Sequence, residues 1–247
     1  MKAMILAAGQ GVRLKPLTDS LPKALVPVAG SPILELVIRK LKASGVTELV
    51  INLHHKGDLI EEFLRKKGSF GLGVSFSRED PLLETGGGLK KAAALLGDED
   101  FLVHNADVIS TVDLKALMAA HRGSGALATL AVRKRPSSRQ LLFDPSGRLA
   151  GRKAQGQPPV WAAAPAEAGV ELAFDGIHAV SPAIFKLMTE TGAFPIMSAY
   201  LRLAGGGRRI AGFRSDGSLW AEIGSLEKLQ AAGRLVEEKG LDAFLRG

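Results

Sequence analysis

Short apolar runs and amphipathic segments alternate over residues 2–121, and this alternation is the strongest constraint on the fold. Residues 33–43 carry apolar side chains at the 3.6-residue spacing of a helix, and Gly45 stands where a glycine commonly follows one. The whole pattern predicts strands at 2–7, 48–53, 73–77 and 101–104, and helices at 33–43, 58–66, 86–96 and 113–121. Strands and helices in this order form right-handed β-α-β units, which predict an α/β fold with a parallel sheet covered by helices on both faces.

Residues 126–247 have a different pattern, in which predicted strands follow one another with turn residues between them. Residues 152–169 are rich in proline, alanine and glycine without periodicity, and we expect a mobile surface loop there. The remaining pattern predicts strands at 126–132, 140–143, 148–150, 171–174, 177–180 and 209–213, and helices at 182–189, 196–203 and 225–239. These elements predict a small antiparallel lobe that shares the central sheet.

The composition is that of a globular protein and narrows the possible classes. The 247 residues include no apolar run long enough to cross a bilayer, and the N-terminal residues lack the shape of a signal peptide. The absence of cysteine excludes disulfides and thiol chemistry and fits a reducing compartment. We therefore expect a cytoplasmic protein that does not bind a membrane.

The net charge of +7 predicts an anionic partner. Nucleic acid is one candidate, and residues 133–135 with Arg139 form the main basic cluster. Only 5% of the residues are aromatic, however, and none are interleaved with that cluster, so base stacking has little support. A small polyphosphate substrate accounts for the charge at least as well, and we expect no nucleic-acid partner.

The first predicted strand ends in a loop of small residues, Ala7-Ala8-Gly9-Gln10-Gly11. Small side chains let backbone N–H groups approach a bound group, and Arg13 and Lys23 add two cations at the rim of the loop. This arrangement suits a polyphosphate, although two glycines alone are more typical of an ordinary strand-to-helix turn. Open α/β sheets bind ligands beyond the carboxyl ends of their strands, so the loop and Asp107 are expected at one edge.

Residues 6–32 as a whole resemble the signature of the sugar-1-phosphate nucleotidyltransferases, also called NDP-sugar pyrophosphorylases. The matching residues are Leu6-Ala7-Ala8-Gly9-x-Gly11-x-Arg13-x-x-Pro16-x-Thr18 and Pro22-Lys23-x-Leu25-x-Pro27-Val28-x-Gly30-x-Pro32. The resemblance implies a Rossmann-like nucleotide-diphospho-sugar transferase fold in which this loop wraps a nucleoside triphosphate. It also implies that Arg13 and Lys23 are catalytic residues on the phosphates, and that the enzyme needs Mg²⁺.

A divalent metal needs hard oxygen ligands such as carboxylates. Asp107 resembles the family's Mg²⁺-binding aspartate at a strand end, although an aspartate there also commonly caps the next helix. Residues 219–225 resemble the family's Trp-x-Asp-x-Gly-Thr stretch, with Glu222 in place of the aspartate. Glu222 can supply the same carboxylate or can have lost the ligand role, and Ser225 is expected to cap the last helix.

The resemblance also assigns residues to the nucleotide and to the sugar. Residues 84–88 resemble the family's turn that packs against the nucleobase, and their sequence is most similar to that of the short N-acetylmuramate-1-phosphate uridylyltransferases. Residues 174–178 resemble the stretch that lines the family's sugar pocket. The predicted nucleotide-binding residues are Leu6, Ala7, Ala8, Gly9, Gly11, Thr85, Gly86, Gly87 and Asn105, and the predicted sugar-binding residues are Glu171, Asp175 and Gly176.

One family motif is absent from the sequence. Many longer relatives carry a Glu-Lys-Pro stretch whose lysine holds the sugar phosphate, and no such stretch occurs here. Arg139, Arg148, Arg152 and Lys153 are candidates for its role, and the sequence does not choose among them.

The resemblance implies one nucleotidyltransferase domain over residues 1–247, with a nucleotide-binding half at 1–125 and a sugar-phosphate-binding half at 126–247. Its substrates would be a nucleoside triphosphate and a sugar 1-phosphate, first UTP with an N-acetylated amino-sugar 1-phosphate such as N-acetylmuramate 1-phosphate, in cell-wall metabolism. The alternatives are a guanylyltransferase on mannose- or heptose-1-phosphate, a cytidylyltransferase on a phosphorylated alcohol, and a catalytically impaired nucleotide-binding regulator. We expect a monomer or a small homo-oligomer.

Overall fold

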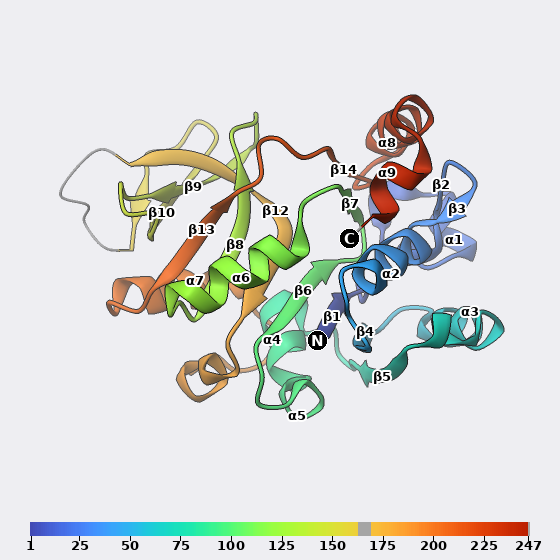
Figure 1. The fold of residues 1–247 in the computed structure, drawn as a ribbon, viewed down its shortest axis with the longest axis horizontal. Coiled ribbons are helices and arrows are strands. Elements are labelled where there is room, and N and C mark those ends of the chain that lie inside the picture. The colour runs from blue at the N-terminus through green and yellow to red at the C-terminus, as the bar shows by residue number, and fades with distance from the viewer. Residues whose placement is uncertain (163–168, 247) are drawn as a thin grey trace.

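The structure, a computed structural model, describes residues 1–162 and 169–246, and a ten-stranded mixed sheet runs through it (Figure 1). Its parallel part consists of β5 (Gly73–Arg78), β4 (Glu48–Leu53), β1 (Lys2–Leu6) and β6 (Phe101–Asn105). Its antiparallel part continues through β12 (Val170–Val180), β9 (Arg139–Phe143), β10 (Leu149–Ala154) and β11 (Val160–Trp161). β8 (Ala128–Arg133) pairs with β12, and β13 (Ile210–Arg214) pairs with β8. The predicted central sheet and its antiparallel lobe are confirmed.

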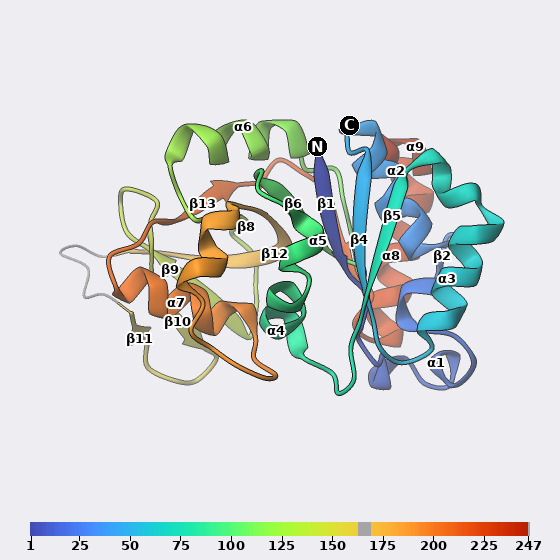
Figure 2. The same ribbon diagram turned by 90° about the horizontal axis from the view of Figure 1, so that it is seen from below.

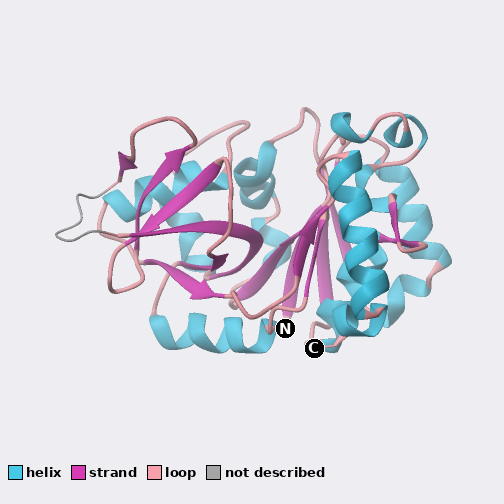
Figure 3. Ribbon diagram, turned by 90° about the horizontal axis from the view of Figure 1, so that it is seen from above, coloured by secondary structure: helices cyan, strands magenta, loops and turns pink. Residues whose placement is uncertain are grey.

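Alternate residues of β1 enter two hydrophobic cores, because successive side chains on a strand point to opposite faces. Ala3 and Ile5 belong to one core, whereas Met4 belongs to the other. Helices that cover the first core are α2 (Ile33–Ala43), α3 (Gly57–Lys66), α6 (Leu114–Ser124), α8 (Leu226–Lys239) and α9 (Leu241–Leu245). Helices that cover the second are α4 (Glu84–Lys91), α5 (Ala93–Leu96) and α7 (Ile196–Gly205). Figures 2 and 3 show helices on both sides of the sheet, as predicted.

Short elements complete the chain path and bring its C-terminal part back to the parallel strands. The segment after β1 contains η1 (Val12–Leu14), α1 (Leu17–Ser20), η2 (Lys23–Leu25), β2 (Pro27–Val28) and β3 (Ser31–Pro32), and η3 (Gly68–Gly71) and η4 (Pro182–Leu187) lie further on. β7 (Val108–Ser110) and β14 (Trp220–Glu222) form a separate antiparallel ladder, after which α8 packs on the first core. No helix in the part of the chain that the structure describes is long and apolar enough to cross a membrane.

Several predicted boundaries are wrong. The turn expected between 171–174 and 177–180 is absent, because β12 runs without a break through Val170–Val180 with a bulge against β8. The helix expected at 86–96 is interrupted at Ala92, and the helix expected at 182–189 is a 3₁₀ helix at Pro182–Leu187. The loop expected at 152–169 includes the end of β10 and all of β11, and its residues 163–168 lie outside the described residues.

Two histidines are buried in the sheet, and their burial makes the fold sensitive to acid. Burial lowers the pKa of His104 on β6 from 6.5 to about 4, and that of His178 on β12 to about 3. Below about pH 6.5 the unfolded chain therefore binds protons that the folded protein excludes, so the free energy of unfolding falls as pH falls towards these values.

Calorimetry across this pH range should show a steep fall in melting temperature. The free energy of unfolding should fall by at most about 1.4 kcal/mol per histidine for each pH unit. His178→Leu should flatten the pH slope, because leucine has a similar volume and does not titrate. Equal slopes for His178→Leu and the unsubstituted protein would contradict this account.

Candidate active site

Thr18 folds the glycine loop after β1 back on itself. Gly11 has a φ of +67°, and a Cβ atom there would lie 2.8 Å from Thr18 Cγ2, so the position favours glycine. The Thr18 hydroxyl donates a hydrogen bond to the Gly11 carbonyl oxygen at 2.9 Å. A Cβ atom at Gly9, in contrast, would have nothing within 4 Å. Gly11 therefore shapes the loop, whereas Gly9 borders open space.

A cavity of about 200 Å³ lies where β1, β4 and β6 end, which is where open α/β sheets bind ligands. The predicted site residues that line it are Leu6, Ala7, Ala8, Gly9, Lys23, Thr85, Asn105 and Asp107. Other residues that line it are Ala24, Asn52, Leu82, Glu84 and Ala106. We call this space the first cavity.

Asn52 is a residue of the first cavity that the sequence interpretation missed. Its Oδ1 atom accepts a hydrogen bond from the Ala7 N–H at 2.6 Å, and its Nδ2 donates to Glu79 Oε1 at 2.7 Å. Glu79 Oε2 in turn accepts from the Leu83 N–H at 2.8 Å. The buried Asn52–Glu79 pair thus ties the glycine loop to the segment before α4. A polar residue inside the apolar run at 48–53 was the available signal.

Lys23 and Asp107 both line the first cavity and contact each other. Lys23 lies on η2, and its ammonium group forms a hydrogen-bonded ion pair with the carboxylate of Asp107, two residues after the end of β6. Eighty-four residues separate the two in the sequence. The parallel sheet therefore brings together the predicted catalytic lysine and the predicted metal ligand.

The β7–β14 ladder brings Glu222 to the same place. Glu222 pairs with Val108, and the Ile223 N–H donates to the Asp107 carbonyl oxygen at 3.0 Å. A Cβ atom built on Gly224 would lie 3.3 Å from Arg13 Nη2 and 3.4 Å from Glu222 Oε2, so the Arg13 and Glu222 side chains flank Gly224. The structure thus gathers all four predicted catalytic and metal residues at one edge of the sheet.

A second, more polar cavity of about 880 Å³ lies in the antiparallel lobe. Glu222 lines it, and so does Glu171, which was predicted to bind the sugar. Its four cationic side chains are Arg135, Arg139, Lys153 and Lys228. Lys153 pairs with Glu171 at 2.7 Å, and Lys228 pairs with Glu222. We call this space the second cavity. Asp107 of the first cavity and Glu222 of the second lie on neighbouring segments at the β7–β14 ladder, and we call this place the junction of the cavities.

The second cavity separates the candidates for the missing Glu-Lys-Pro lysine. Arg139 and Lys153 line this cavity, whereas Arg148 and Arg152 do not. The sequence interpretation did not assign Arg135 or Lys228 to the site, although the basic run at 133–135 was visible. A run of consecutive basic residues does not show by its spacing which side chain points into a cavity.

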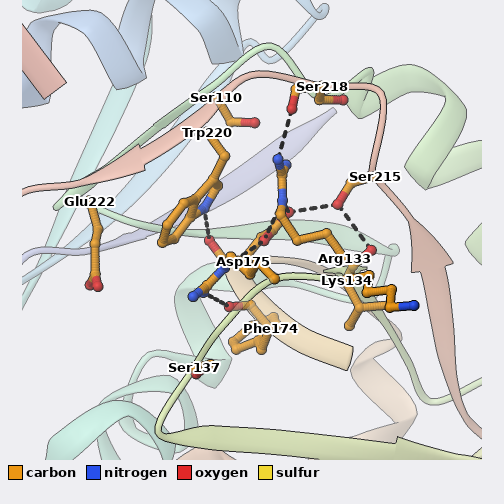
Figure 4. Close-up of polar contacts among 12 residues, drawn as sticks. Ser110, Arg133, Lys134, Ser137, Phe174, Asp175, Ser215, Ser218, Trp220 and Glu222 are labelled. Atoms are coloured by element: carbon orange, nitrogen blue, oxygen red, sulfur yellow. Dashed lines mark hydrogen bonds and ion pairs between the residues drawn. The ribbon is translucent and has the colours of Figure 1, made fainter. Parts of the chain in front are cut away.

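Asp175, which was predicted to bind the sugar, does not line the second cavity. Its side chain is fully buried, accepts hydrogen bonds from Arg133 Nε at 2.8 and 2.9 Å and from Ser215 Oγ at 2.6 Å, and lies among these partners in Figure 4. Burial raises the pKa of Asp175, and the bonds from Ser215 and Arg133 oppose that rise. The Trp220 indole N–H donates to the Asp175 carbonyl oxygen at 2.9 Å. Asp175 therefore joins β8, β12 and the segment that enters β14.

Gly176 also stands apart from the second cavity. Its φ is +77°, and a Cβ atom there would lie 2.7 Å from Asn105 Nδ2. The glycine therefore lets β12 approach Asn105, which lines the first cavity. Among the three predicted sugar-binding residues, only Glu171 lines the second cavity.

A model of the nucleotidyl transferase family matches residues 2–141, which is more than half of the chain. The N-acetylmuramate alpha-1-phosphate uridylyltransferase of Neisseria meningitidis is 34% identical over 244 residues, covering 96% of this chain and 98% of that protein. The chain belongs to the nucleotidyltransferase family.

Two further comparisons define the limits of this likeness. A mannose-1-phosphate guanyltransferase of Gibberella zeae is 39% identical over 137 residues, but these cover 54% of this nucleotidyltransferase and 38% of the relative. The structure of UDP-glucose pyrophosphorylase from Acinetobacter baumanii matches with a TM-score of 0.79 at 21% identity, covering 97% of this chain and 94% of that chain. The structural match confirms the predicted fold.

The carboxylates of this nucleotidyltransferase suit a metal that arrives with its substrate. No group of three or more His, Cys, Asp or Glu residues that could hold an ion occurs in residues 1–162 and 169–246. Mg²⁺, however, commonly binds one or two carboxylates together with substrate phosphates and water. Asp107 and Glu222 supply two carboxylates at the junction of the cavities, and each is paired with a lysine ammonium group. The residues present therefore fit Mg²⁺.

Gly86 and Gly87, which were predicted to bind the nucleotide, pack closely against another segment. Their N–H groups both donate to the Phe194 carbonyl oxygen, at 2.8 and 3.3 Å, and neither residue lines the first cavity. A Cβ atom on Gly86 would lie 2.3 Å from Phe194 Cε2, and one on Gly87 would lie 2.4 Å from the Gly192 carbonyl oxygen. The two glycines let α4 press against the segment before α7.

Gly86→Ala should therefore lower the free energy of unfolding by about 1–3 kcal/mol, because the added methyl group overpacks against Phe194. Gly9→Ala is the matched control, since a Cβ atom there meets no neighbour. Gly9→Ala should leave the denaturant midpoint unchanged but raise KM for the nucleotide, because Gly9 lines the first cavity. A stable Gly86→Ala variant with weakened nucleotide binding would restore the original prediction for Gly86.

Proposed function

We propose that this nucleotidyltransferase transfers the uridylyl group of UTP to N-acetylmuramate 1-phosphate or a closely related N-acetylated amino-sugar 1-phosphate, releasing pyrophosphate. The observation that carries the proposal is the junction of the two cavities, where Asp107 lines the first and Glu222 lines the second. A relative whose name states this activity matches along almost the whole chain, across both cavities.

The two cavities suit a direct transfer between two bound anions. The triphosphate would occupy the first cavity and the glycine loop, and the sugar 1-phosphate would occupy the second. An oxygen of the sugar phosphate attacks the α-phosphorus in line, the bond from that phosphorus to the β-phosphate oxygen breaks, and pyrophosphate leaves. The protein forms no covalent bond, so its contribution is positioning and neutralisation of charge by Arg13 and Lys23.

Asp107 and Glu222 would hold Mg²⁺, which supplies charge neutralisation at the phosphate oxygens when bound. Lys23 and Lys228 occupy these carboxylates in the structure, and a metal ion would compete with both ammonium groups. The freed ammonium groups could then contact phosphate oxygens. Glu222 would thus keep the ligand role of the family's aspartate with one more methylene.

The remaining expectations extend this proposal to the whole protein. Residues 1–125 would bind the nucleotide and residues 126–247 the sugar phosphate, with the β7–β14 ladder linking the two halves. We place the reaction in the cytoplasm, as a step of cell-wall sugar metabolism, in a monomer or small homo-oligomer that needs no nucleic acid or membrane.

Pyrophosphate release with each of four nucleoside triphosphates and a panel of sugar 1-phosphates tests the proposal. The highest kcat/KM should occur with UTP and N-acetylmuramate 1-phosphate in the presence of Mg²⁺. Preference for GTP with mannose 1-phosphate would favour the guanylyltransferase alternative, which the partial match to such an enzyme supports less well. Nucleotide binding without turnover of any pair would show a regulatory homologue instead.

A further inference from the structure

The second cavity contains more positive charge than its own carboxylates neutralise. Its two lysines are each paired with a glutamate, Lys153 with Glu171 and Lys228 with Glu222. Its two arginines, Arg135 and Arg139, have no partner among the carboxylates that line it. Among the described residues, no carboxylate oxygen lies within 4.0 Å of a side-chain nitrogen of Arg139, and the one within that distance of Arg135 belongs to Asp175.

Asp175 gives Arg135 little neutralisation. Its carboxylate lies 3.9 Å from Arg135 Nε, while Arg133 Nε donates to it at 2.8 Å and Ser215 Oγ at 2.6 Å. Arg135 Nε is itself buried without a hydrogen-bond partner in the described part of the chain. Partly burying a guanidinium without a close carboxylate is unfavourable unless an anion binds there.

The surroundings of Arg135 hold its guanidinium in one orientation. The group lies 4.0 Å from the centre of the Trp220 ring, and its Nη2 donates to the Phe174 carbonyl oxygen at 3.0 Å. Trp220 is fixed by its bond to the Asp175 carbonyl oxygen, which Figure 4 shows. A stacked and hydrogen-bonded arginine loses little conformational entropy when it binds a planar carboxylate with two parallel N–H bonds.

We propose that Arg135, together with Arg139, binds a carboxylate carried by the sugar, so that the second cavity selects acidic over neutral amino-sugar 1-phosphates. This inference rests on the proposed function, and it names the residues that determine the sugar. N-acetylmuramate carries a lactyl carboxylate that N-acetylglucosamine lacks. The phosphate of the same substrate would lie beside Glu222 and Lys228.

The test compares N-acetylmuramate 1-phosphate with its methyl ester, which keeps the phosphate and the size of the lactyl group but removes the negative charge. Unsubstituted enzyme should bind the acid more tightly than the ester, by isothermal titration and by KM. Arg135→Gln should raise Kd and KM for the acid about 10- to 100-fold and change those for the ester less than about twofold. Arg135→Lys keeps the positive charge but cannot donate two parallel N–H bonds. Its Kd and KM for the acid should lie between those of the unsubstituted enzyme and those of Arg135→Gln.

Two controls separate the carboxylate contact from structural damage. Arg152→Gln changes an exposed arginine outside the cavity and should alter neither substrate. Arg139→Gln changes an exposed residue whose loss should not unfold the protein, and it should weaken the acid selectively even if Arg135→Gln misfolds.

Equal losses for acid and ester would overturn the proposal, because they would show that the arginines hold the phosphate or the fold. Unchanged affinity for the acid in both variants would also overturn it. Absence of turnover with either sugar in the unsubstituted enzyme would instead contradict the proposed function. The titration would still decide the carboxylate contact in that case, since it needs no turnover.

Discussion

Asp107→Asn should lower kcat by about 1,000-fold or more, equivalent to about 4 kcal/mol of lost transition-state stabilisation. The substitution removes the Asp107 carboxylate, which is one of the two proposed to hold Mg²⁺ and is also the ion-pair partner of Lys23. The side chain keeps its size, and the backbone bond from Ile223 to the Asp107 carbonyl oxygen remains. The loss should therefore appear in catalysis rather than in folding. Steady-state kinetics over a range of Mg²⁺ concentrations would measure it.

Asp113→Asn is the matched control for this prediction. Asp113 caps α6, where its Oδ1 atom accepts a hydrogen bond from the Ala116 N–H at 2.9 Å, and asparagine caps helices about as well. Activity and stability should both stay near those of the unsubstituted enzyme. Comparable activity in Asp107→Asn and Asp113→Asn would show that Asp107 is not part of the reaction.

Asp175→Ala should lower the free energy of unfolding by about 3–5 kcal/mol, because it leaves the Arg133 guanidinium buried without its carboxylate. In a chain of this size each kcal/mol corresponds to roughly 2–4 °C, so calorimetry should record a fall of about 10 °C in melting temperature. Asp216→Ala removes a more exposed ion pair to Arg214 and should cost no more than about 1 kcal/mol.

A combined Arg133→Met and Asp175→Leu variant should recover much of the lost stability, since neither charge then remains buried. If Asp175→Ala kept its melting temperature and instead lost affinity for the sugar, the structural role assigned to Asp175 would be wrong. The original expectation of a sugar contact would then stand.

Elements with strong local periodicity were predictable from the sequence. α2 at Ile33–Ala43 and β4 at Glu48–Leu53 have the predicted bounds, because the apolar residues that predicted them are the ones that the structure buries in the core. The edge of the sheet was predictable for a related reason. Parallel strands place their carboxyl ends together, so the glycine loop and Asp107 had to meet.

Elements that depend on distant partners were not predictable. The Asp175-Gly176 pair is typical of a turn, but Arg133 and Ser215, each about 40 residues away, hold it inside a continuous strand. The glycines at 86 and 87 resemble a ligand loop, yet their neighbours are Phe194 and Gly192, more than 100 residues on. No local pattern records such contacts.

The candidate site divides in the same way. Arg13, Lys23 and the small residues of the glycine loop lie in one continuous motif, whereas Arg135 and Lys228 reach the second cavity through the antiparallel lobe and α8. A run of basic residues shows that charge is present. Only the packing of Trp220 and Phe174 shows which arginine is held in the cavity.

The most direct test of the central claim follows the oxygen atoms of the sugar phosphate. N-acetylmuramate 1-phosphate labelled with ¹⁸O at all four phosphate oxygens would be incubated with UTP, Mg²⁺ and the enzyme, and both products analysed by mass spectrometry. Direct attack across the junction of the two cavities predicts a UDP-sugar that contains all four labelled oxygens and pyrophosphate that contains none. Label in pyrophosphate, or the absence of a UDP-sugar, would contradict the account.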